Sequence, residues 1–101
     1  MIDVNKIEKL VEEEYIEACG MYPMFHSGHE AHNVIREELE ESEHELQMCK
    51  IALERMWAQV KNDDDYVGTV EDLKYRSLKL IQEAIQVSAM CDKAINSVRT
   101  K

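Results

Sequence analysis

Acidic side chains between residues 37 and 41 have the type and the spacing of a divalent-metal site. The segment Glu37–Glu41 reads EELEE and contains the pattern E-E-x-x-E. On an α-helix, which turns by about 100° per residue, Glu38, Glu41 and Glu45 fall on one stripe at about 0°, −60° and −20°. Hard cations prefer such oxygen ligands. The spacing therefore predicts a carboxylate stripe suited to Mg²⁺ or Mn²⁺.

A second group of oxygen ligands is predicted on a later helix. Taking Glu83 as zero, Gln86 lies at about −60°. Each of the two helices also carries an apolar stripe, which we call its seam. The seam lies at the same angles from Glu83 on this helix as from Glu38 on the earlier helix. If the two seams pack together, both polar stripes face a common cleft. The predicted metal site comprises Glu38, Glu41, Glu83 and Gln86. Substrate phosphates and waters would complete the coordination of Mg²⁺. The alternative is the ordinary solvated face of an acidic helix.

Several charged side chains lie near this predicted cleft. Arg76 lies at about 20° and Lys79 at about −40° from Glu83, within two helical turns. Either cation could contact a triphosphate, although Lys79 could instead form an i,i+4 surface pair with Glu83. Glu37 and Glu45 are candidates for the general base that activates a water beside the metal.

A short histidine series offers a competing metal chemistry. His26, His29 and His32 are spaced by three residues, and paired imidazoles at that spacing can bind Zn²⁺. No cysteine or further ligand stands near them in the sequence. We therefore do not expect a zinc site at these histidines.

Long helices are expected to position these residues. The chain of 101 residues has only three glycines and one proline, which argues for long helices and against a sheet with many turns. The first helix is expected over residues 3–19, with Gly20 as a left-handed cap. The second begins at a capping box formed by Ser27 and Glu30 and lasts to about Lys61.

The remaining segments connect and complete these helices. Residues 21–26 form an apolar connector that should pack back on the helices. Residues 62–68 form the turn before the third helix, and Thr69 is its predicted N-cap.

Both long helices carry an apolar seam with alternating four- and three-residue spacing. In the second helix the seam comprises Ile35, Leu39, Ser42, Leu46, Cys49, Leu53, Met56 and Val60. In the third it comprises Leu73, Ser77, Leu80, Ala84, Val87, Cys91, Ala94 and Val98. A further apolar row widens the third stripe, which suits contact with more than one neighbour. We therefore predict one all-α domain over residues 1–101, with long antiparallel helices in a bundle completed by a homodimer or a higher homo-oligomer.

Composition excludes several classes of protein. Lys plus Arg is 12 and Asp plus Glu is 21, which gives a formal charge of −9. Such a chain repels nucleic acid and anionic membranes, so neither is an expected partner. No segment reads as a transmembrane helix or a signal peptide. The three cysteines form no C-x-x-C pair and are expected to be reduced, which favours a cytoplasmic location.

Two segments also resemble a known family. FHSGHEAHNVIREELEESEHEL at 25–46 and QEAIQVSAM at 82–90, together 31 residues, are similar to the MazG-like all-α nucleoside triphosphate pyrophosphohydrolases, and especially to their small phage- and prophage-type branch. The resemblance implies Mg²⁺-dependent cleavage of an NTP or dNTP to the monophosphate and pyrophosphate. It implies Glu38, Glu41 and Glu83 as metal ligands, and His29 as a structural or substrate-contacting residue at the start of the helix.

One departure from the family pattern keeps a second function open. Gln86 stands where the wider family has aspartate, so one anionic ligand is lost and the metal affinity should fall. The alternative function is therefore a catalytically weak or inactive helical interaction protein that retains the scaffold. Gln86 favours this alternative, whereas the three glutamates favour the enzyme.

Overall fold

The computed structural model describes residues 1–21 and 24–100, and within them the chain is all-α, as predicted. It forms three helices, α1 (Val4–Met21), α2 (Gly28–Lys61) and α3 (Val67–Arg99), and the described residues contain no strand. The molecule is elongated, with extents of 61 × 28 × 21 Å. No helix in these two ranges combines the length and the apolar character needed to cross a membrane.

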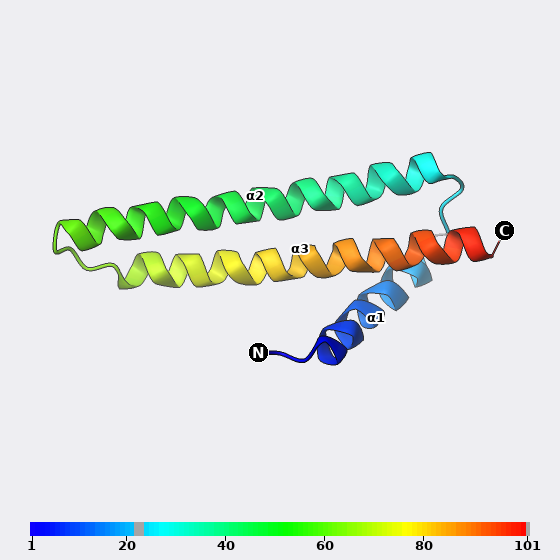
Figure 1. Ribbon diagram of the computed structural model, residues 1–101, viewed down its shortest axis with the longest axis horizontal. Helices are drawn as coiled ribbons and strands as arrows, with labels where there is room; N and C mark the ends of the chain where they lie inside the picture. The colour runs from blue at the N-terminus through cyan, green and yellow to red at the C-terminus, as the bar shows by residue number, and fades with distance from the viewer. Residues whose placement is uncertain (22–23, 101) are drawn as a thin grey trace.

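The two long helices form a hairpin. α2 and α3 lie side by side along most of their length and run in opposite directions (Figure 1). α1 packs obliquely against the C-terminal part of α3. The middle of α2 therefore lies beside the middle of α3, which places residues near 40 opposite residues near 83.

The start of α2 follows the predicted capping box. The Glu30 N–H donates to Ser27 Oγ at 3.2 Å, and the Glu30 carboxylate accepts from the His26 N–H at 3.5 Å. The first bond satisfies a donor that the first helical turn leaves without a partner, whereas the second reaches the N–H of the residue before the N-cap, one residue earlier than in a standard capping box. The helix ends at Lys61, as predicted.

Two other helix boundaries differ from the predictions. α1 continues through Gly20 to Met21, so a left-handed cap at Gly20 is wrong. α3 begins at Val67, whose N–H donates to Asp65 Oδ1 at 2.9 Å, and Thr69 is buried inside the first turn instead of capping it. A short aspartate side chain bonds readily to the backbone two residues ahead, so the turn at Asp65 starts the helix early.

The connector between α1 and α2 packs against α3 through Phe25. This ring is only 4 % exposed, and the Phe25 N–H donates to Ser97 Oγ at 3.0 Å. Ser97 Oγ in turn donates to the Lys93 carbonyl at 2.7 Å. The expected packing of the connector is seen at Phe25, whereas its residues 22 and 23 lie outside the described part of the chain.

Removing the Ser97 hydroxyl should destabilise this end of the molecule. Ser97→Ala leaves the buried Phe25 N–H without an acceptor, which costs about 1–3 kcal/mol. Urea denaturation should show this decrease in the free energy of unfolding. Ser88→Ala, at an exposed position on the same helix, is the control and should change little. Equal effects of the two substitutions would contradict the role of the Ser97 bond.

The apolar seam of α2 is only partly covered by α3. Ala52 and Ala89 are fully buried, whereas Leu39, Leu46 and Leu53 are 52 %, 43 % and 56 % exposed. The prediction that the two seams meet face to face is therefore wrong in part. Small alanines allow close helix approach, and a single neighbouring helix covers only one side of a wide apolar stripe. Leu39, Leu46, Leu53 and Val60, which we call the leucine row, remain exposed at seven-residue spacing.

Candidate metal centre

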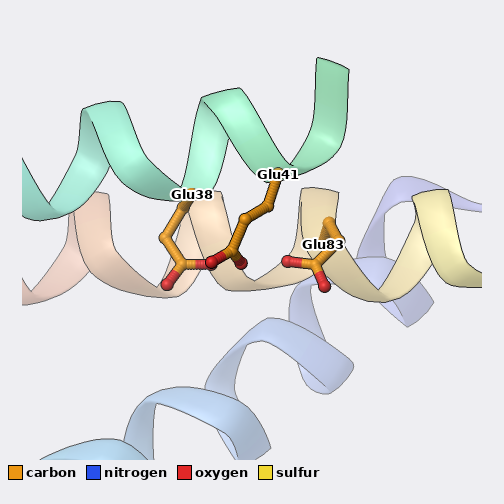
Figure 2. A group of neighbouring side chains, drawn as sticks. All are labelled: Glu38, Glu41 and Glu83. Carbon is orange, nitrogen blue, oxygen red and sulfur yellow. The ribbon is translucent and has the colours of Figure 1, made fainter. Parts of the chain in front are cut away.

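Three carboxylates from two helices converge where α2 passes α3. Glu38 and Glu41 project from α2 and Glu83 projects from α3 (Figure 2). One carboxylate oxygen from each lies within 4.8 Å of the other two. Glu38 and Glu41 share a helix face because they are three residues apart, and the hairpin brings Glu83 opposite them. The convergence expected from spacing is therefore present. We call these three residues the carboxylate centre.

The electrostatics of the carboxylate centre resist full ionisation. Burial raises the pKa of Glu38 above its ordinary value, and the charges of Glu41 and Glu83 raise it further. Burial and the neighbouring Glu41 also raise the pKa of Glu83. Glu38 and Glu83 each hold one buried oxygen without a hydrogen-bond partner. A divalent cation would neutralise these charges and supply partners for the oxygens.

Gln86 borders the carboxylate centre on two sides. It lines a cavity of about 440 Å³ together with Glu38. It also lines a groove of about 310 Å³ together with Glu83. The half-buried Gln86 side chain is therefore placed beside two of the three glutamates, one turn along α3 from Glu83. Its amide oxygen could serve as a neutral fourth ligand.

The two candidate bases line a different cavity from Gln86. Glu37 and Glu45 both line a second cavity of about 370 Å³, which also includes Glu41, His44 and Glu83. Glu45 is half-buried, whereas Glu37 is exposed. Both carboxylates therefore share a cavity with Glu41 and Glu83 of the centre.

The predicted substrate-binding cations occupy different surroundings. Arg76 Nη1 lies 3.7 Å from Glu45 Oε2, so its charge already has a partner. Lys79 Nζ lies 5.7 Å from the centroid of the Tyr75 ring, and the Lys79 charge lowers the pKa of Glu83. Lys79 therefore acts on one carboxyl of the centre, whereas Arg76 lies beside Glu45.

His29 lies apart from the carboxylate centre. It is exposed in the first turn of α2 and lines none of the three cavities described above. Nine residues separate it from Glu38, which is about 13 Å along a helix. Any contact between His29 and a substrate would therefore involve a part of the substrate remote from the metal.

Sequence reasoning missed the far end of the 440 Å³ cavity. Phe25 and Lys93 form that end, and Glu14 and Glu30 also line the cavity. Two signals were present in the sequence. Glu14 occupies the apolar spacing of the first helix, and Lys93 interrupts the inner face of α3 seven residues after Gln86. A charged residue on a buried face is more informative than one on a surface.

The raised pKa values predict a pH dependence of the metal-free protein. A carboxyl whose pKa is raised by folding binds protons more readily in the native state. The free energy of unfolding should therefore fall as pH rises from the ordinary glutamate value of 4.5 through the raised pKa of Glu38. Glu38→Gln should flatten this part of the profile, measured by urea denaturation in EDTA between about pH 4.5 and 8.

The control for this pH profile is Glu43→Gln. Glu43 is exposed on the same helix and lies outside the three cavities. Its neutralisation removes the same formal charge and should leave the slope of the wild-type profile in place. If both variants flatten the profile equally, the crowding of carboxylates at the centre is not its cause.

Comparison of the chain with family models, with curated proteins and with solved structures gives no match. The observations that bear on function are therefore the three converging carboxylates, the cavities that adjoin them and the charged residues around them.

Proposed function

We propose that this chain is a MazG-like, Mg²⁺-dependent nucleoside triphosphate pyrophosphohydrolase, which converts an NTP or dNTP to the monophosphate and pyrophosphate. The observation that carries the proposal is the approach of three carboxylate oxygens, from two helices, to within 4.8 Å of one another. Pairs of glutamates on facing helices are a common way to build metal sites in helical bundles. The cavities on either side leave room for substrate.

The residues present suit a hard divalent cation. Glu38, Glu41 and Glu83 would hold Mg²⁺ or Mn²⁺, with Gln86 as a neutral oxygen ligand on the adjoining turn. When bound, the cation would polarise the phosphate oxygens and lower the pKa of a bound water. Three carboxylates would fill only part of the coordination sphere of Mg²⁺. The remaining positions would be open to phosphate oxygens, as in the Mg²⁺ sites of nucleotide enzymes.

Glu37 is the stronger candidate for the general base. It is exposed, lines the cavity beside Glu41 and Glu83, and forms no ion pair in residues 24–100. Glu45 Oε2 lies 3.7 Å from Arg76 Nη1, so the guanidinium competes with a water for this oxygen. Glu37 would take a proton from the attacking water, while Arg76 and Lys79 would offset charge on the leaving pyrophosphate.

The leucine row supports a homodimer or a higher homo-oligomer. Its four apolar side chains are all at least 38 % exposed and lie on one face of α2. A second copy could cover this row through the same row related by two-fold symmetry. Sedimentation equilibrium should give a mass of at least twice 11.8 kDa, whereas a monomer at micromolar concentration would exclude this arrangement.

A helical interaction protein is the second candidate function. The observation that favours it is Gln86, which adds no charge to the centre. A screen of pyrophosphate release over all NTPs and dNTPs, with Mg²⁺ and with Mn²⁺, decides between the two. Turnover of any nucleotide supports the enzyme, and no turnover with any of them supports the interaction protein.

A further inference from the structure

Lys93 lines the 440 Å³ cavity and places there a cation that has no ion-pair partner among the described residues. The residue is 6 % exposed, and its Nζ lies 4.5 Å from the centroid of the Phe25 ring. None of the ion pairs in residues 1–21 and 24–100 involves Lys93. The face of an aromatic ring attracts an ammonium group but accepts none of its hydrogen bonds in the usual geometry, so donors of Lys93 stay available to the cavity. The position therefore favours a ligand that brings a hydrogen-bond acceptor to Lys93.

The cavity that Lys93 lines continues to the carboxylate centre. It has a volume of about 440 Å³, within the usual range of small-molecule pockets. Glu38 and Gln86 line the end shared with the centre, and Phe25 and Lys93 line the other end. From Gln86 to Lys93 is about 10 Å along α3. Val34 and Met90 lie between the two ends and supply apolar walls.

The charges in this cavity select the acceptor. Glu14, Glu30 and Glu38 line the same space as Lys93. A phosphate group would be repelled by these carboxylates, whereas a neutral carbonyl oxygen would not. Lysine supplies donors and no acceptor, and ionised glutamate supplies acceptors and no donor. The lining therefore suits a flat, neutral group that carries a carbonyl oxygen and ring or exocyclic N–H groups.

We propose that this cavity holds the base of the nucleotide and that Lys93 donates a hydrogen bond to a ring carbonyl, so that bases bearing a carbonyl are preferred to adenine. This inference rests on the proposed function, because the shared residue Glu38 places the base next to phosphates bound at the carboxylate centre. Adenine carries an amino group where guanine and hypoxanthine carry a carbonyl. Lys93 is then a specificity-determining residue, with Phe25 holding its ammonium in place.

Inosine and adenosine provide the sharpest pair of probes, because their bases differ only in the 6-substituent and in the proton that hypoxanthine carries on N1. Calorimetric titration of the full chain in EDTA should show inosine binding at least about tenfold more tightly than adenosine, the usual effect of a hydrogen bond to a charged donor. Cytidine and uridine should also bind more tightly than adenosine. Inorganic phosphate, the probe for an anion site, should not compete with inosine.

Three variants isolate the ammonium group. Lys93→Met keeps an unbranched stem against Phe25 and should bring the inosine-to-adenosine ratio close to one. Lys93→Arg keeps a donor and should restore part of the preference, which also guards against misfolding of the methionine variant. Lys74→Met removes an exposed lysine from the same helix and should leave the ratio unchanged. Circular dichroism should show equal helix content in all of them.

The outcomes separate this inference from the proposed function. Nucleoside binding needs neither metal nor turnover, so an inosine preference that depends on Lys93 upholds the base pocket even if no pyrophosphate is released. Equal binding of inosine and adenosine by the wild-type chain overturns the inference, whether or not nucleotides are hydrolysed. It is also overturned if no nucleoside binds, or if inorganic phosphate displaces inosine.

Discussion

Mg²⁺ is expected to raise the thermal unfolding midpoint of the wild-type chain by about 10 °C, and Glu38→Gln or Glu41→Gln is expected to abolish that rise. A ligand that binds only the native state stabilises it by RT ln(1 + [L]/Kd), which is about 2.3 kcal/mol at fifty times Kd. In a domain of this size, 1 kcal/mol corresponds to about 4–8 °C. Melts with and without about 5 mM MgCl₂ measure the shift.

The same substitutions should act in opposite directions on the metal-free fold and on activity. Without metal, Glu38→Gln should be neutral or slightly stabilising, because it relieves the repulsion that raises the pKa of Glu38. Pyrophosphate release should fall by at least about 100-fold, since a misplaced metal forfeits several kcal/mol of transition-state stabilisation. A general loss of packing would instead destabilise the protein in both conditions.

Glu43→Gln serves as the control for the metal experiment as well. Glu43 lies two residues from Glu41 and is exposed, so the variant carries the same change of charge on the same helix without touching the carboxylate centre. Glu13 would be a poor control, because it lines the groove that contains Glu83 and Gln86. If Glu43→Gln loses the Mg²⁺-dependent shift as fully as Glu41→Gln, the three carboxylates do not form the site.

Helical periodicity was sufficient to place the carboxylate centre. Glu38 and Glu41 are three residues apart on one helix, so their shared face follows from the 100° turn per residue. Glu83 occupies the matching position on the returning helix, and its approach needed only an antiparallel hairpin with a short turn. That convergence tolerates some rotation of each helix, because glutamate side chains are long.

Periodicity was not sufficient to decide which part of each apolar stripe meets the other helix. Ala52 and the leucine row are both apolar, and adjacent residues differ by about 100° in direction. The small size of Ala52 and Ala89 favours their place at the contact, but a hydrophobic pattern alone gives them less weight than leucine. The sequence pattern therefore predicted burial of Leu46, which is 43 % exposed.

The cavity end at Phe25 and Lys93 depends on the path of a connector, which has no repeating pattern to read. Phe25 reaches α3 because its N–H finds the Ser97 hydroxyl 72 residues later in the chain. A bond of that sequence separation is set by the tertiary fold and not by local propensity. For the same reason no local pattern predicted that Lys93 lies over an aromatic ring.

Gln86→Glu and Gln86→Asp are expected to strengthen Mg²⁺ binding by about tenfold or more, because each gives the cation a fourth anionic ligand. Glutamate keeps the length of the glutamine side chain, so it tests charge alone, whereas aspartate also shortens the reach by one methylene. The dissociation constant is measured from the melting midpoint as a function of MgCl₂ concentration.

The metal-free proteins should respond in the opposite sense. A fourth carboxylate beside Glu38 and Glu83 adds repulsion to a centre in which these two half-buried carboxyls already have raised pKa values. Gln86→Glu should therefore lower the melting midpoint in EDTA and raise it above wild type in saturating Mg²⁺. Gln47→Glu, which adds the same charge at an exposed position of α2, should show no such crossing. If Gln86→Glu and Gln47→Glu shift the melting midpoint equally and leave the Mg²⁺ affinity unchanged, the side chain of residue 86 lies outside the coordination sphere. The fourth ligand position would then be filled by water or substrate alone.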